Sequence, residues 1–161
     1  MILVSACLAG INCKHDGSNN YNEFVCTLVK QGQAIPVCPE QLGGLPTPRA
    51  TSEILDKRVK TACGKDLTTN FLKGARETLF LARMIGCKKA IFKQRSPSCG
   101  FGEIYDGSHT GTVIEGNGIT ANFLYKNGIE ILNESQIDKF NAEDLVYRSA
   151  DRDSEDNFPK K

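Results

Sequence analysis

The sequence lacks the features that mark a membrane protein, a nucleic-acid-binding protein or a zinc ribbon. Its 161 residues contain no apolar run close to the roughly 20 residues that a membrane span requires. The formal net charge is only +1, without the basic excess that binds nucleic acid polymers. None of the seven cysteines forms a Cys-x-x-Cys pair, so a thioredoxin-like motif is not predicted either. We therefore expect neither a membrane nor a nucleic acid polymer as a partner.

The segment before Cys7 is too short for a signal peptide. It ends in LVSAC, which is similar to the cleavage box of a bacterial lipoprotein, but only six residues precede the cysteine and none is cationic. We expect the mature chain to start at Met1 and the protein to be cytoplasmic. In a reducing compartment, a chain of this size does not need disulfide bonds.

Short apolar runs alternate with amphipathic segments along most of the chain. The predicted strands cover 2–6, 34–37, 89–93 and 129–132, and the predicted helices cover 21–32, 67–86 and 117–128. Repeated strand–helix–strand order predicts one α/β domain, with a sheet of about four mainly parallel strands and flanking helices. In the first helix, Tyr21, Phe24, Val25 and Leu28 are spaced to share one face, with Asn19 or Asn20 as the N-cap.

Three stretches are less regular. Residues 51–66 are predicted to hold a small hairpin, and the Gly-rich residues 101–116 a long functional loop or short strands. The polar, charge-mixed end of the chain predicts a frayed tail. We divide the chain into an α/β domain over 1–135 and a partly disordered C-terminal extension over 136–161.

Four cysteines fall near the ends of predicted strands. Cys7 ends the first strand, Cys38 ends the second, and Cys99 follows the third by a short loop. Cys13 lies in the loop after the first strand. Because the carboxyl ends of parallel strands open on one edge, where ligands bind, Cys7, Cys38 and Cys99 are expected to form a three-thiolate site. The other cysteines are expected to be buried or half-buried small hydrophobic residues: Cys26, Cys63 and Cys87.

Three kinds of chemistry fit three converging thiols. A zinc ion usually takes four protein ligands, and Cys13 and His15 are available to complete the set. An iron–sulfur cluster with three cysteine ligands leaves one iron open as a Lewis acid. The thiols can also act without a metal. Glu40 and Ser96 or Ser98 accompany the site; each fits either a turn or a role in moving protons and orienting water.

Five segments together resemble the 2-thiouracil desulfidase family, formerly a domain of unknown function. They are SACLAGINCKHDG, PVCPEQLGGLPTPRATSE, LTTNFLKGA, KQRSPSCG and GNGITANFLYKNGIEI, and the likeness runs from residue 2 to about residue 134. The resemblance implies a Rossmann-like domain with a 4Fe–4S cluster on Cys7, Cys38 and Cys99. Cys13 belongs to the first segment, either as a ligand or as a thiol beside the ligands. The family's proton-transfer residues fall on Glu40 and Ser96.

The resemblance also implies the reaction, which is hydrolytic removal of sulfur from a thiocarbonyl compound such as a thiolated nucleobase. The open iron would bind the substrate sulfur, Glu40 would activate water, and Ser96 would help to position the base. The alternative is a non-catalytic iron–sulfur or zinc-binding protein that handles sulfur or metal. Arg49 and Lys93 are expected either to add positive charge near the cluster or to be ordinary surface charges, and His109 to face solvent.

Overall fold

The computed structural model describes residues 1–139, so most of the predicted extension over 136–161 lies outside the described residues. Its centre is a parallel sheet in which the strands lie in the order β2 (Ala34–Val37), β1 (Ile2–Ser5), β5 (Lys89–Phe92) and β8 (Glu130–Asn133). All three neighbouring pairs are parallel. The four strands are those predicted from the sequence, and the α/β class is confirmed.

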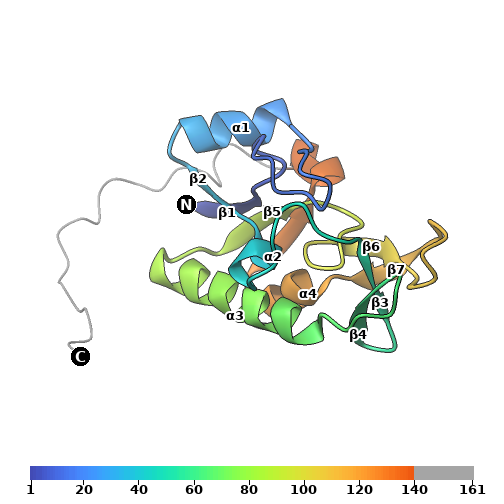
Figure 1. The fold of residues 1–161 in the computed structure, drawn as a ribbon. Coiled ribbons are helices and arrows are strands. Elements are labelled where there is room, and N and C mark those ends of the chain that lie inside the picture. The colour runs from blue at the N-terminus through green and yellow to red at the C-terminus, as the bar shows by residue number, and fades with distance from the viewer. Residues whose placement is uncertain (140–161) are drawn as a thin grey trace.

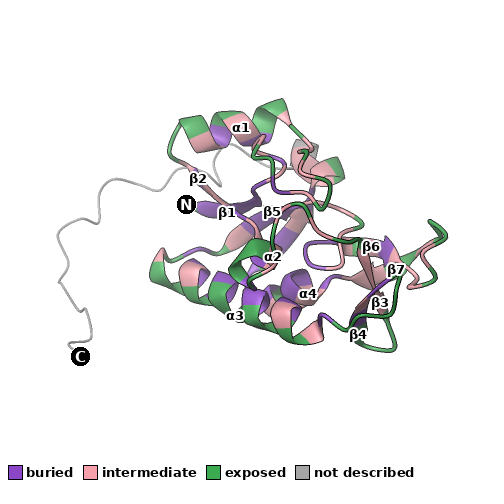
Figure 2. Cartoon of the chain, in the orientation of Figure 1, coloured by how far each residue is buried: buried purple, intermediate pink, exposed green. Residues whose placement is uncertain are grey.

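Helices cover both faces of this sheet (Figure 1). One face carries α1 (Glu23–Lys30), and the other carries α3 (Thr68–Met84) and α4 (Ile119–Lys126). Successive strand residues alternate between the two cores, because side chains of a strand point to opposite faces. Val4 packs with the α1 side, whereas Leu3 and Phe92 pack with the α3 and α4 side. Figure 2 shows the buried residues gathered in the strands and on the inner faces of the helices.

Helix α1 begins later than the sequence predicted. Its N-cap is Asn22, whose side-chain oxygen accepts a hydrogen bond from the Val25 amide at 3.1 Å, so the predicted cap at Asn19 or Asn20 is wrong. Asn19 instead accepts a hydrogen bond from the Tyr21 amide in the preceding loop. Tyr21 therefore precedes the helix and is 58% exposed, while Val25 is fully buried.

Two antiparallel hairpins stand beside the sheet and lie next to each other (Figure 1). The first pairs β3 (Ser52–Leu55) with β4 (Arg58–Thr61), which confirms the hairpin predicted within 51–66. The second pairs β6 (Phe101–Tyr105) with β7 (Val113–Asn117), so the Gly-rich region holds short strands. The Glu53 carboxylate joins the hairpins by accepting hydrogen bonds from the amides of Gly107 and His109, both at 3.0 Å.

A short helix, α2 (Pro39–Leu42), directly follows Cys38 and was not predicted. It packs against α3 at two glycines, Gly43 and Gly74, where the backbones approach closely. A Cβ atom at Gly74 would lie 2.8 Å from the carbonyl carbon of Pro39. Within residues 1–139, no helix is both long and apolar enough to cross a membrane. The last described element is a 3-10 helix, η1 (Glu134–Lys139).

Candidate active site

A cavity of about 440 Å³ opens where the parallel strands end. Most residues that the sequence suggested for the site line it: Cys7, Cys13, His15, Cys38, Glu40, Ser96 and Cys99. Ser98 does not line it; its buried hydroxyl is hydrogen-bonded to the Thr120 hydroxyl at 2.9 Å. The three thiols proposed as ligands come from the segments after three neighbouring strands, β1, β2 and β5. The topology therefore gathers residues that are far apart in the chain.

Cys13 lies between Cys7 and Cys38. The Cys38 Sγ is 3.9 Å from the Cys13 carbonyl oxygen, and the Cys13 side chain hydrogen-bonds to both neighbouring thiols. These hydrogen bonds lower the pKa of Cys7 and lower the pKa of Cys38 to about 7. The same hydrogen bonds raise the pKa of Cys13, and its burial raises it further.

Cys99 is held by a tight turn on the N-terminus of α4. The Ser96 Oγ accepts hydrogen bonds from the amides of Ser98 and Cys99, at 3.1 and 3.0 Å. The first amides of α4 in turn donate to backbone carbonyls of the turn, at Pro97 and Ser98. Burial raises the pKa of the Cys99 thiol well above its usual value, although a hydrogen bond with Ser5 opposes this.

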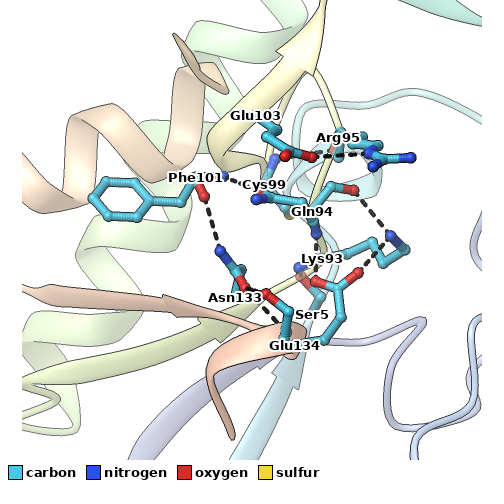
Figure 3. Close-up of polar contacts among 11 residues, drawn as sticks. Ser5, Lys93, Gln94, Arg95, Cys99, Phe101, Glu103, Asn133 and Glu134 are labelled. Atoms are coloured by element: carbon cyan, nitrogen blue, oxygen red, sulfur yellow. Dashed lines mark hydrogen bonds and ion pairs between the residues drawn. The ribbon is translucent and has the colours of Figure 1, made fainter. Parts of the chain in front are cut away.

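The segment that carries this turn is tied to the end of β8 (Figure 3). The Glu134 carboxylate accepts hydrogen bonds from the Lys93 ammonium and the Gln94 amide, each at 2.6 Å. The Gln94 side chain accepts one from the Phe101 amide at 3.0 Å, and the Asn133 side chain donates to the Phe101 carbonyl at 3.1 Å. Lys93 lines the cavity, which places a positive charge beside the thiols.

Glu40 is the second residue of α2 and is paired with Arg49. Its Oε2 is 2.7 Å from the Arg49 Nε, and the two side chains are 14% and 7% exposed. The other carboxylate oxygen has no hydrogen-bond partner within the described part of the chain. Glu40 therefore enters the cavity wall as a carboxylate with one oxygen fixed and one available.

A protein-family comparison matches residues 2–136 to the family described as 2-thiouracil desulfurase. The chain belongs to this family. The family predicted from the sequence motifs is thus confirmed. A separate comparison with curated proteins finds the uncharacterized protein YbbK of Bacillus subtilis strain 168. It is 40% identical over 147 residues, which are 85% of this chain and 97% of YbbK.

A solved structure is also similar to this 2-thiouracil desulfurase family member. It is described as the [4Fe-4S]-dependent thiouracil desulfidase TudS and is 38% identical, with a TM-score of 0.82. The match covers 86% of this chain and 93% of the TudS chain.

The donor set of this family member fits an iron–sulfur cluster better than a single ion. Within residues 1–139, no group of three His, Cys, Asp or Glu side chains is arranged to hold one metal ion. Three thiols spaced around a cavity fit a larger core that takes a cysteine at several corners. Sulfur is also the soft ligand that such clusters prefer.

The remaining cysteines and His109 do not line the cavity. Among the remaining cysteines, Cys87 is buried as predicted, but Cys63 is exposed, and the prediction that it is at least half-buried is wrong. Cys63 lies in the turn after β4, where its Sγ is 3.1 Å from the Thr61 hydroxyl. His109 lies against Glu53, with 3.8 Å between its Nδ1 and the carboxylate. Its side chain is half-buried, so the prediction that it faces solvent is wrong.

Sequence reasoning missed the pairing of Arg49 with Glu40 and the cavity-lining position of Glu53. Arg49 and Glu53 each form hydrogen bonds with loops that are far away in the sequence, Arg49 with the Cys13 carbonyl and Glu53 with the Gly107 amide. The sequence near Arg49 gives one indication that its position is fixed, because Arg49 follows the three prolines of the segment after Cys38.

Proposed function

We propose that this chain removes sulfur from the thiocarbonyl group of a small heterocyclic base such as 2-thiouracil, using a 4Fe–4S cluster held by Cys7, Cys38 and Cys99. Its family and its [4Fe-4S]-dependent relative make it an iron–sulfur-dependent desulfidase. One observation carries the residue assignment: a single cavity contains three thiols from three strand ends together with a carboxylate.

The residues around the cavity support binding of an anionic, sulfur-ligated cofactor. Lys93 and Arg49 both line the cavity, each paired with a carboxylate. After the hydrogen bonds with Cys13, the charge of Lys93 also lowers the pKa of Cys7, and the charge of Arg49 that of Cys38. When bound, a 4Fe–4S cluster with three cysteine ligands supplies an open, Lewis-acidic iron suited to a soft sulfur atom. In this arrangement Cys13 is assigned as a thiol beside the three ligands and not as a fourth ligand.

Glu40 is the proposed general base. The reaction breaks the C–S bond and forms a C–O bond, so thiocarbonyl and water give carbonyl and hydrogen sulfide without net redox change. Water must lose protons as it attacks the carbon, and a carboxylate in the wall of the site can accept one. The oxygen of Glu40 that is not bound to Arg49 is the one assigned to this step.

Ser96 is proposed to have two functions. Its oxygen already accepts two backbone hydrogen bonds, which hold the turn that contains Cys99. The hydroxyl proton has no acceptor within the described residues, and Ser96 lines the cavity. We assign this proton to a hydrogen bond with the attacking water or with the substrate.

The test is anaerobic reconstitution with iron and sulfide, followed by assays of visible absorption, bound iron and sulfide release from 2-thiouracil. Cys99→Ser should lose the cluster, whereas Cys63→Ser, which changes an exposed cysteine outside the cavity, should retain both cluster and activity. Glu40→Gln should retain the cluster but lose roughly 10²–10⁴-fold in kcat. A protein that binds the cluster but releases no sulfide from any thiolated base would support the non-catalytic alternative.

A further inference from the structure

We infer that Arg49 is a positioning residue for Glu40: its guanidinium fixes one carboxylate oxygen against the loop that contains Cys13 and leaves the other oxygen available to the cavity. This inference rests on the proposed function, because it concerns the geometry of the proposed general base. The sequence allowed Arg49 either to add positive charge near the cluster or to be an ordinary surface charge. Its buried ion pair with Glu40 excludes the second of these.

All three guanidinium nitrogens of Arg49 are bound to acceptors of the protein. Nε donates to the Glu40 Oε2 at 2.7 Å, and Nη2 donates to the Cys13 carbonyl at 3.0 Å. Nη1 donates to the Pro46 carbonyl at 3.2 Å and to the Thr47 hydroxyl at 3.1 Å. With a side chain only 7% exposed, Arg49 lies within the wall and its donors are already used.

These contacts join three segments that form one side of the cavity. They are α2, the loop before Arg49, and the loop after β1, to which Arg49 is also joined by a hydrogen bond from its amide to the His15 carbonyl at 2.7 Å. Helix α2 has only four residues, and its Glu40 side chain makes no other hydrogen bond within the described part of the chain. The orientation of the carboxylate therefore depends on Arg49.

A lysine at this position could not reproduce the arrangement. Its ammonium is a compact charge at the end of a flexible chain, whereas the planar guanidinium binds several acceptors in fixed directions. Arg49→Lys keeps the positive charge near Glu40 but cannot hold Glu40, the Cys13 carbonyl and the Pro46 carbonyl together. The substitution thus tests the orientation of the Glu40 carboxylate while the positive charge beside it is kept.

The experiment compares kcat, KM and bound iron for wild type, Arg49→Lys and a control, Arg58→Lys, with the reconstituted protein and 2-thiouracil. Arg58 also forms an ion pair, with Asp66 at 2.8 Å, but lies on β4 with a 66% exposed side chain. We expect Arg49→Lys to lose about 10–100-fold in kcat, because small misplacements of a catalytic group are costly. Its KM should stay within about 3-fold and its iron content unchanged, and the control should match wild type.

A second measurement asks whether Arg49 acts through Glu40. In a Glu40→Gln background, adding Arg49→Lys should lower kcat by less than about 2-fold, because the group it positions is already lost. Equal losses in both backgrounds would overturn the inference. So would a raised KM with unchanged kcat, which would indicate that Arg49 binds substrate, or a fall in iron content with unchanged activity per cluster.

If Arg49→Lys does not fold, Thr47→Val takes its place, since it removes one acceptor of the Nη1 group without changing either charged residue. The Thr47 hydroxyl also accepts a hydrogen bond from the Gln41 side chain at 2.9 Å, so Gln41→Ala is the matched control. A lower kcat at constant KM and iron content supports the inference, and an unchanged kcat overturns it. The proposed function fails in a different way: wild-type protein with a full cluster then releases no sulfide at all.

Discussion

Replacing Gly74 with alanine should destabilise this protein, although the same change stabilises most helices. Gly74 lies inside α3, where alanine is preferred over glycine by about 1 kcal/mol. Here, however, the added Cβ would meet the backbone of α2, 2.8 Å from the Pro39 carbonyl carbon and 3.3 Å from the Gly43 nitrogen. Ordinary contacts begin at 3.4 Å, so one of the two helices has to move.

The size of the effect follows from these two terms. Overpacking costs about 1–3 kcal/mol, and the obstacle here is backbone that cannot rotate away. Because backbone is in the way, we take the upper part of that range, about 2–3 kcal/mol. After subtraction of the helix-propensity gain of about 1 kcal/mol, we expect the free energy of unfolding to fall by about 1–2 kcal/mol. For a chain of this size, that lowers the Tm by about 2–8 °C.

The same displacement should reduce catalysis. Helix α2 begins directly after Cys38 and contains Glu40, and a shift of about 1 Å in a catalytic group costs on the order of 10²-fold in rate. Thermal unfolding and sulfide release from 2-thiouracil measure the two effects. Lys73→Ala, at an exposed position of the same helix, serves as the control. A Gly74→Ala protein with an unchanged or higher Tm and wild-type sulfide release would refute the packing argument.

Three further predictions concern residues outside the thiol site. Asn22→Ala removes the N-cap of α1 and should cost about 1 kcal/mol in denaturant unfolding, and no loss would show that another group caps the helix. Glu134→Gln keeps the shape of the side chain but removes the charge that pairs with Lys93, and should lower the free energy of unfolding by about 1 kcal/mol. A free energy of unfolding equal to that of wild type would mean that the ion pair does not stabilise the fold. Hydrogen bonding from Thr61 lowers the pKa of Cys63, so alkylation of Cys63 should begin at lower pH than that of an ordinary thiol. Thr61→Val should move the pH midpoint of alkylation upward, and an unchanged midpoint would contradict this cause.

The sheet was predictable because its strands are short apolar runs between helical patterns. AIPV and KAIF match β2 and β5 at nearly every residue. The order of strands across the sheet was not predictable, since periodicity describes each segment alone and the neighbours β1 and β5 are far apart in sequence. The start of α1 was misplaced because several asparagines precede it, and only the loop geometry decides that Asn22 is the cap.

The thiol site was predictable for a topological reason. Parallel strands end at one edge, so cysteines after β1, β2 and β5 had to lie near each other. The wall of the cavity was not predictable in the same way. The contact between Arg49 and Glu40 depends on the path of a loop that contains two prolines, Pro46 and Pro48. The position of Glu53 depends on how two hairpins lie side by side. Long-range contacts of this kind leave no periodic pattern in the sequence.

Each of the three proposed ligands is held by contacts that do not involve a cofactor. The Cys7 carbonyl accepts a hydrogen bond from the Asn20 amide at 3.0 Å, Cys38 begins a helix that packs on α3, and Cys99 lies in a turn bound to α4. The two main cores lie on the faces of the sheet, and only Cys99 among these ligands belongs to a buried core cluster. Small zinc domains are unfolded without metal because the metal replaces a core. This chain has its main cores on the two faces of the sheet, so we expect it to fold before a cluster binds at the proposed ligands.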